Sequence, residues 1–191
     1  MKLGLLGGTF DPVHHGHLAV AQAALDVLEL DELRLLVAGD PWQKEPRTPA
    51  AVRVELARLA VADHDELEID DRECRRSGPT YTVDTLLELR AEEPDRQLTF
   101  LLGADAAARL STWHRVDDLP ALAQIVAVNR PGHRMPDLPH WVEELEVPPL
   151  DISSTQLREL AHAGRSLRYL VPEPVRRRIG EYGLYGPADG T

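Results

Sequence analysis

The chain has 191 residues, a length typical of one domain with a full-sized core. Its net charge of −11 argues against a nucleic-acid or anionic-membrane surface, because both require basic patches. No apolar stretch approaches the roughly 18 residues of a membrane span, and residues 1–6 are too short for a secretory signal. We therefore expect one soluble, cytoplasmic domain over residues 1–191, with no nucleic-acid or membrane partner. A homo-oligomer is compatible with this composition.

Strands and helices alternate along the chain. Hydrophobic patterning predicts strands at 2–6, 33–38, 66–69, 98–102 and 124–128. It predicts helices at 15–28, 50–61, 83–90, 154–162 and 174–182. Because parallel strands need crossover connections, this order predicts an α/β, three-layer Rossmann-like fold with a mostly parallel sheet and helices on both faces. The C-terminal part, about residues 150–185, is expected to be helical. No element is assigned to the proline-rich residues 131–149, and the tail from Gly186 is expected to be loose.

The stretch GGTFDPVHHGH, residues 7–17, lies where the first strand gives way to the first helix. Ligands of open parallel sheets bind at the carboxyl ends of the strands. Gly7 and Gly8 allow backbone N–H groups to approach a phosphate, and the helix N-terminus adds a partial positive charge. The glycine spacings of the dinucleotide fingerprint and of the P-loop are both missing. We therefore predict a phosphate cradle of a different kind.

Two histidines supply the polar groups of this cradle. His14 and His17 are three residues apart, so both rings fall on one face of the first helical turn. Imidazole N–H groups at this position can donate hydrogen bonds to phosphate oxygens. Two other interpretations are surface histidines at a helix start and a zinc site, for which no third ligand is apparent.

A second motif, ISSTQLR, occupies residues 152–158. Ser153 and Gln156 have the spacing of a capping box, which predicts a helix start at Ser153 with backbone N–H groups available to phosphates. Arg158 falls about one turn into this helix and can reach phosphate oxygens by a forked contact. The alternative for Arg158 is an exposed helical arginine without a ligand.

These motifs resemble a known family. His14, His15, Gly16 and His17 resemble the H-x-G-H box of the nucleotidyltransferase superfamily, and residues 152–158 resemble its ISST motif with an arginine three residues on. The intervening segments resemble the bacterial nicotinate-nucleotide adenylyltransferases. These segments are TYTVDTL at 80–86, LLGAD at 101–105, Trp113 with His114 and Arg115, and VNRPG at 128–132. The resemblance spans nearly the whole chain, from Lys2 to Tyr185.

The resemblance implies that ATP adenylylates nicotinate mononucleotide, giving nicotinate adenine dinucleotide and pyrophosphate. Mg²⁺ would arrive with ATP, and no protein-held metal site is expected. The attacking group is already a phosphate oxygen, so catalysis reduces to alignment and charge stabilisation without a protein nucleophile. The implied catalytic residues are His14, His17, Lys44 and Arg158. The implied ATP-binding residues are Gly7, Gly8, Thr9, Phe10, His14, His17, Gly103, Asp105, Ile152, Ser153, Ser154 and Arg158.

On the acceptor side, the resemblance implies a second set of residues. Backbone N–H groups of Tyr81 and Thr82 would bind the nicotinate carboxylate, and Trp113 would stack on the pyridine ring. Asp105 would accept from ribose hydroxyls. The implied mononucleotide-binding residues are Thr9, Lys44, Tyr81, Thr82, Asp105, Trp113 and Arg130. Trp113 as a core residue and Tyr81 as a packing residue are the alternatives.

One loop departs from the family pattern. The family often carries a proline-proline-histidine-lysine run where this chain has Asp40, Pro41, Trp42, Gln43 and Lys44. The lysine matches, whereas Gln43 replaces the histidine, so Lys44 either neutralises phosphate or is a solvated loop lysine. Two alternative functions stay open. The chain could transfer a nucleotidyl group to another phosphate acceptor, or it could be a catalytically silent nucleotide-binding regulator.

Overall fold

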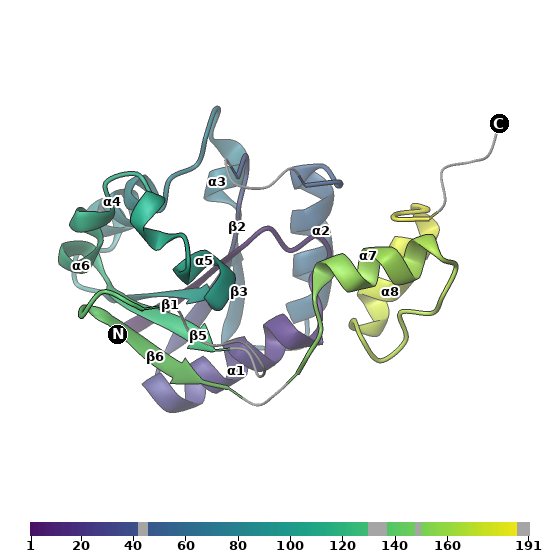
Figure 1. Ribbon diagram of the computed structural model, residues 1–191, viewed down its shortest axis with the longest axis horizontal. Helices are drawn as coiled ribbons and strands as arrows, with labels where there is room; N and C mark the ends of the chain where they lie inside the picture. Colours follow the sequence, from purple (N-terminus) through teal and green to yellow (C-terminus); the bar gives the residue numbers. More distant parts are fainter. Residues whose placement is uncertain (42–45, 130–136, 148–149, 187–191) are drawn as a thin grey trace.

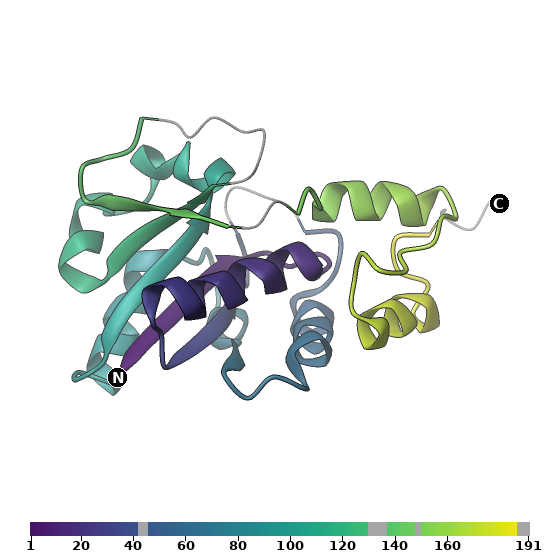
Figure 2. The ribbon, with the colours of Figure 1, turned by 90° about the horizontal axis from the view of Figure 1, so that it is seen from below.

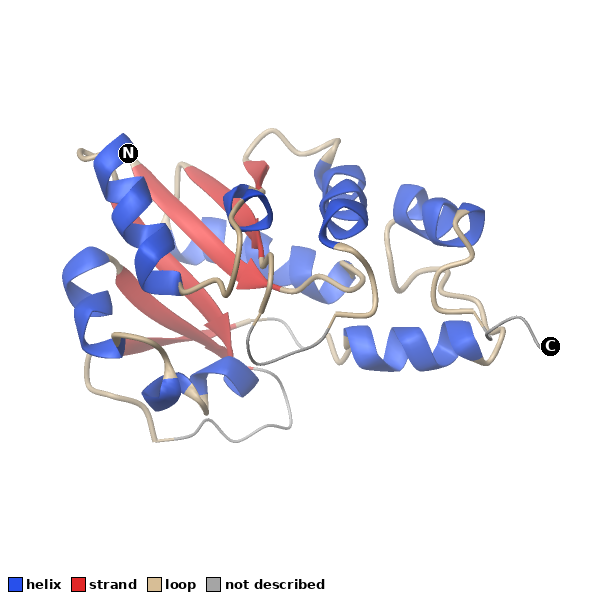
Figure 3. Ribbon diagram, turned by 90° about the horizontal axis from the view of Figure 1, so that it is seen from above, coloured by secondary structure: helices blue, strands red, loops and turns tan. Residues whose placement is uncertain are grey.

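The computed structural model describes residues 1–41, 46–129, 137–147 and 150–186 (Figure 1). Within these residues, six strands form one sheet in which every pairing is parallel (Figure 3). The strands, in chain order, are β1 (Lys2–Gly8), β2 (Glu32–Val37), β3 (Leu67–Asp70), β4 (Gln97–Gly103), β5 (Gln124–Asn129) and β6 (Val142–Glu146). Their order across the sheet is β3-β2-β1-β4-β5-β6.

Helices connect the strands and extend the chain beyond the sheet. They are α1 (His15–Leu28), α2 (Ala50–Val61), α3 (Arg72–Arg75), α4 (Thr82–Glu92), α5 (Ala104–Ala107), α6 (Leu119–Leu122), α7 (Ser154–His162) and α8 (Glu173–Glu181). Two 3₁₀ turns, η1 (Leu110–Thr112) and η2 (Val116–Asp118), lie between α5 and α6. No helix within the described ranges is long and apolar enough to cross a membrane.

Alternating side chains of the strands form two cores. In β4, Leu101 packs with α1 and α2 on one face of the sheet, whereas Phe100 and Leu102 pack with α4 and the α5–α6 region on the other. This alternation follows from the two-residue period of a strand whose two faces are both covered. The predicted three-layer α/β fold with a parallel sheet is therefore confirmed.

The chain reverses its direction across the sheet after β3. It runs outward from β1 through β2 to β3, and then returns to β4 on the other side of β1 before continuing to β5 and β6. The carboxyl ends of β1 and β4 therefore flank the point where the strand order changes. Ligands of such sheets bind at this point, because the connecting loops diverge there and leave a crevice.

The C-terminal helices α7 and α8 form a pair beyond the sheet (Figures 1 and 2). Helix α8 packs against α2. Leu157 of α7 and Val175 of α8 are buried in the same apolar cluster as residues of α1 and α2. The helical C-terminal part predicted from the sequence is thus observed, and α7 begins and ends at the predicted residues.

Strand β6 is the main element that the sequence analysis missed. Its sequence, VEELE, buries Val142 and Leu145 but carries three glutamates. Among the described residues it pairs only with β5, so it lies at one edge of the sheet. Charged side chains are common on edge strands, where they oppose pairing with other chains. They also weaken the apolar pattern from which a strand is predicted.

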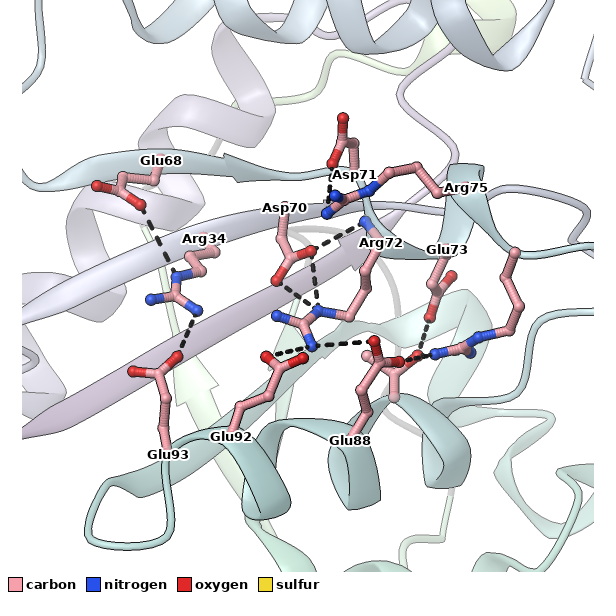
Figure 4. Close-up of polar contacts among 12 residues, drawn as sticks. Arg34, Glu68, Asp70, Asp71, Arg72, Glu73, Arg75, Glu88, Glu92 and Glu93 are labelled. Carbon is pink, nitrogen blue, oxygen red and sulfur yellow. Dashed lines mark hydrogen bonds and ion pairs between the residues drawn. The ribbon is translucent and has the colours of Figure 1, made fainter.

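Ion pairs connect β3 and α3 with α4 (Figure 4). Arg72 lies between Asp70, at 2.8 Å, and two glutamates of α4, Glu92 at 3.0 Å and Glu88 at 3.6 Å. The Arg72 side chain is only 10% exposed. This network fixes the α3–α4 connection, from which residues 80–82 approach the carboxyl ends of the strands.

Candidate active site

Two cavities meet at the carboxyl ends of β1 and β4. The first has a volume of about 480 Å³ and the second about 170 Å³. Both are lined by Gly7, Gly8, Thr9 and Ala106, so these residues form a shared wall. Every residue predicted to bind ATP lines the first cavity, including the whole set from the H-x-G-H region and from residues 152–158. The fold therefore brings together two motifs that lie about 140 residues apart in sequence.

Close packing of aromatic rings is a second reason why glycine is needed at positions 7 and 8. A Cβ atom on Gly7 would lie 2.8 Å from the Phe100 ring, and one on Gly8 would lie 2.8 Å from the Phe10 ring. Phe10 itself has a φ of 50°, in the left-handed region that costs energy for residues with a side chain. The absence of a Cβ atom at both glycines thus leaves room for the Phe100 and Phe10 rings.

The two histidines form a capping pair at the start of α1. The rings of His14 and His17 are stacked, with their centroids 3.7 Å apart. The backbone N–H of His14, the N-cap residue, donates to Nδ1 of His17 at 3.3 Å. Because Nδ1 accepts this bond, the neutral His17 ring carries its proton on Nε2, which leaves Nε2–H as its donor.

Gly16 allows this histidine pair to form. A Cβ atom on Gly16 would lie 3.0 Å from Nδ1 of His14 and 3.4 Å from the carbonyl oxygen of Ile152. His14 is only 1% exposed. The glycine of the H-x-G-H box therefore leaves room both for the buried ring and for the approach of the 152–158 segment.

Helix α7 begins at the predicted capping box. The Ser153 hydroxyl accepts from the backbone N–H of Gln156 at 3.2 Å, and the Ser153 N–H donates to Oε1 of Gln156 at 3.0 Å. Ser154 Oγ donates to the carbonyl oxygen of Pro12 at 2.9 Å. The start of α7 is thereby joined to the loop that follows β1.

Arg158 also contacts that loop. Its Nη1 donates to the carbonyl oxygen of Asp11 at 2.7 Å, and its Nη2 donates to Oγ1 of Thr155 at 3.1 Å. Its Nε atom is buried and has no hydrogen-bond partner among the described residues. Arg158 therefore has a structural contact that the sequence analysis did not foresee, and its Nε remains as a donor at the first cavity.

The second cavity contains most of the described residues predicted for the mononucleotide. Tyr81 is the N-cap of α4 and Thr82 is its first residue, so their N–H groups lie at a helix N-terminus. Trp113 lines the same cavity and packs edge-on against Phe100. Asp105 lines the first cavity instead. Lys44 and Arg130 lie outside the described residues.

Arg53 is a site residue that the sequence analysis missed. Its side chain is 0% exposed and donates to four carbonyl oxygens, those of Thr9 at 2.8 Å, Ala38 at 2.7 Å, Gly39 at 3.0 Å and Thr48 at 3.1 Å. Burial lowers the pKa of its guanidinium, because the charged form loses hydration. A signal existed in the sequence, since Arg53 interrupts the apolar stripe of the predicted helix 50–61.

Asp11 joins three distant parts of the chain. Its carboxylate accepts from the Tyr185 hydroxyl at 2.7 Å and from the Arg47 N–H at 2.7 Å, and the residue is 3% exposed. Thr48 Oγ1 donates to the Tyr185 hydroxyl oxygen at 3.0 Å. Burial raises the pKa of Tyr185, and so does its hydrogen bond to Asp11. Tyr185 therefore stays protonated as a donor to the loop beside the histidines.

Glu73 places a carboxyl group in the wall of the second cavity. The residue is 6% exposed, and Oε1 accepts from Thr85 Oγ1 of α4 at 2.8 Å. Burial raises the pKa of Glu73, and this effect exceeds the opposing effects of the Thr85 hydrogen bond and of the Arg76 charge. Sequence analysis gave no reason to select this residue.

Comparison with known proteins places the chain in a family. A family model described as cytidylyltransferase-like matches residues 5–160. The chain is 45% identical over 187 residues to a Geobacillus thermodenitrificans protein named "Probable nicotinate-nucleotide adenylyltransferase", covering 97% of this chain and 86% of that one. It is also 45% identical over 185 residues to a protein of the same name from Thermus thermophilus, covering 97% of this chain and all of that one.

A solved structure shows the same fold at low sequence identity. This is the Plasmodium falciparum nicotinic acid mononucleotide adenylyltransferase complexed with NaAD, with a TM-score of 0.82 and 18% identity. The alignment covers 96% of this chain and 97% of that one. The family model, the full-length relatives and the shared fold agree: the chain belongs to the cytidylyltransferase-like family and, within it, to the nicotinate-nucleotide adenylyltransferases.

Proposed function

We propose that the protein transfers the adenylyl group of ATP to nicotinate mononucleotide in these two cavities. This step forms nicotinate adenine dinucleotide for NAD biosynthesis. The observation that carries this proposal is the shared wall of Gly7, Gly8 and Thr9. ATP in the first cavity and the mononucleotide in the second would meet at this wall. Their phosphates are the groups that must react, so this arrangement suits the transfer.

The reaction needs positioning more than covalent chemistry. A phosphate oxygen of the mononucleotide attacks the α-phosphorus of ATP, and a new P–O bond forms there. The bond between the α-phosphorus and the bridging oxygen breaks, and pyrophosphate leaves with that electron pair. Enzymes accelerate such transfers by holding the reactants in line and by stabilising the charge that spreads over the phosphate oxygens.

Donors around the first cavity suit a triphosphate. His17 offers Nε2–H from the first turn of α1, and His14 is stacked beside it. The 152–158 motif supplies Arg158 and the N-terminus of α7, with Ser153 and Ser154, to the same cavity. We assign His14 and His17 to the α-phosphate and Arg158 with the α7 N–H groups to the β- and γ-phosphates.

The second cavity suits the acceptor. N–H groups of Tyr81 and Thr82 at the start of α4 would bind the nicotinate carboxylate, since helix N-termini favour anions. Trp113 would offer its ring to the pyridine. Asp105 lies in the first cavity, where its carboxylate would accept from a ribose hydroxyl. Lys44 and Arg130 would bind the mononucleotide, and Lys44 would also neutralise the transferring phosphate.

Mg²⁺ would enter bound to the triphosphate. Magnesium prefers phosphate oxygens and water to an all-protein cage. The histidine and arginine donors of the first cavity suit the phosphate oxygens that remain exposed in such a complex. Since α7 supplies part of this donor set, the sheet and the C-terminal helices would act as one catalytic unit over residues 1–191.

Initial rates with a panel of acceptors at fixed Mg-ATP test the proposal. Nicotinate and nicotinamide mononucleotides differ by a carboxylate against an amide. An amide NH₂ that faces only N–H donors loses a hydrogen bond, which costs about 1 to 3 kcal/mol, and a site built to bind a charge discriminates further. We expect kcat/KM to favour the nicotinate form by at least about 100-fold.

Other outcomes would support other functions. Turnover of a different phosphate, such as phosphopantetheine, without turnover of nicotinate mononucleotide would identify another nucleotidyltransferase. ATP binding without pyrophosphate release with any acceptor would indicate a silent regulator. Equal rates with the two pyridine mononucleotides would contradict the proposed carboxylate recognition.

A further inference from the structure

The acceptor cavity is lined by Glu73 and also by a residue of opposite charge. Among the described residues that line this cavity, Arg109 is the one arginine or lysine. It lies two residues after the end of α5 and is the N-cap of η1 (Leu110–Thr112). The mononucleotide assigned above is an acid, and the chain as a whole carries a net charge of −11. A cation at this cavity would therefore attract an acidic ligand.

The Arg109 guanidinium has no protein partner in the described part of the chain. Its side chain forms no hydrogen bond or ion pair with another described residue, although its backbone N–H donates to Ala106 and its carbonyl accepts from Thr112. Asp105 lies four residues earlier, the spacing of a helical ion pair, but no such pair forms. Asp105 lines the first cavity, whereas Arg109 lines the second.

The position of Arg109 indicates which end of the ligand it reaches. The reacting phosphate must lie at the wall shared by both cavities, next to Gly8 and Thr9. Residues that line only the second cavity therefore surround the remainder of the mononucleotide. Arg109 belongs to this set, together with Thr82 and Trp113, which we assigned to the pyridine ring and its carboxylate.

The carboxyl group of Glu73 explains why a cation would be needed at the pyridine end of the acceptor cavity. This group lines the same cavity and would repel a nicotinate carboxylate whenever it is ionised. The hydrogen bond from Thr85 holds Glu73 toward α4, and Arg76 adds a nearby positive charge that does not line the cavity. Arg109 supplies the compensating charge on the cavity side.

We propose that Arg109 is a specificity-determining residue that binds the nicotinate carboxylate and so favours the acid over the amide. N–H groups of α4 can also donate to the carbonyl oxygen of an amide, whereas a guanidinium distinguishes the two ligands by their charge. This inference rests on the proposed function. It adds a contact from the α5–η1 connection to the contacts from α4.

The test compares Arg109→Gln and Arg109→Lys with the unmodified protein. For Arg109→Gln we expect kcat/KM for nicotinate mononucleotide to fall about 5- to 10-fold, the effect of a partly exposed charge pair. The value for nicotinamide mononucleotide should change less than about 2-fold, and the KM for ATP should be unchanged. A lysine keeps the charge but not the fork, so Arg109→Lys should retain most of the preference.

Arg165→Gln is the matched control. Arg165 is exposed between α7 and α8, lines neither cavity and makes no side-chain hydrogen bond with described residues. Its replacement removes the same charge, so neither acceptor should be affected. Equal losses for both acceptors in Arg109→Gln would place Arg109 at the shared phosphate and overturn the inference. An unchanged ratio would also overturn it, while failure of the unmodified protein to use nicotinate mononucleotide would instead refute the proposed function.

Discussion

The guanidinium of Arg53 donates to the carbonyl oxygen of Thr9 at 2.8 Å, and Thr9 belongs to the wall that the two cavities share. The same Nη1 atom donates to Ala38 at the end of β2. One buried side chain therefore fixes the relative position of the loops that follow β1 and β2. Under the proposed function, the alignment of the two substrates would depend on this contact, because Thr9 lines both cavities.

Replacement of Arg53 should reduce both stability and turnover. Arg53→Met leaves four carbonyl oxygens without their donor, and each unsatisfied buried group costs about 1 to 3 kcal/mol. We expect the free energy of unfolding in urea to fall by about 3 kcal/mol or more. Arg53→Lys should restore little, because an ammonium group cannot span four carbonyls.

Arg58→Met on the same helix is the control for this prediction. Its side chain is 60% exposed and forms an ion pair with Asp71 at 2.9 Å. Exposed pairs contribute at most about 1 kcal/mol. A loss of stability in Arg53→Met no larger than that in Arg58→Met would contradict the role of Arg53.

His17→Ala should lower kcat by about 100-fold or more, the usual effect of losing one electrostatic donor to the transition state. The structure adds a smaller second effect. His17 Nδ1 accepts from the His14 N–H in the cap of α1, so the variant should also lose about 1 kcal/mol of stability. Steady-state kinetics and thermal unfolding would separate the two effects. His15→Ala, at the first residue of α1 and outside both cavities, should keep nearly normal turnover.

Arg158→Ala should raise the KM for ATP at least about 10-fold and change the KM for the mononucleotide much less, because a lost phosphate contact affects the substrate that carries the triphosphate. Arg158→Lys should recover part of the loss, since lysine cannot reproduce contacts to both Asp11 and Thr155. Equal changes in both KM values would indicate that Arg158 acts through the Asp11 loop alone.

Glu73→Gln should gain stability relative to the unmodified protein as the pH rises. The pKa of Glu73 is raised in the fold from its ordinary value of 4.5, mainly by burial. Below pH 4.5 the group is neutral in both states and carries no penalty. Above that pH the unfolded chain ionises it more readily than the fold does, so the unmodified protein loses stability until the pH passes the raised pKa. Melting temperatures of both proteins at about pH 4 and about pH 7 test this, and a pH-independent difference would refute it.

Local patterns sufficed to predict most elements, whereas the resemblance to a known family implied that the two motifs bind one nucleotide. Helices 15–28, 50–61 and 154–162 match the observed bounds, because periodicity and capping residues act within a few positions. The motif at 7–17 and the motif at 152–158 also carry their own geometry, and both line one cavity. The geometry within each element and each motif depends on neighbours in sequence, which is why it can be predicted from sequence.

Contacts between distant segments could not be predicted in this way. Arg53 binds carbonyl oxygens, which every residue possesses, so no side-chain pattern identifies its partners. The burial of Glu73 depends on how α3 meets α4. The position of Asp105 also needed the fold, because the resemblance implied contacts to both nucleotides whereas Asp105 lines only the first of the two cavities.

The bond between Tyr185 and Asp11 joins positions 174 residues apart. A ribosome makes Asp11 early and Tyr185 much later, so a growing chain can complete the sheet while its first loop still lacks this partner. Arg158 joins the same loop only slightly earlier. Nucleotide capture by a nascent chain should therefore be weak until the C-terminal helices have been made, which delays the binding of ATP until after the sheet has folded.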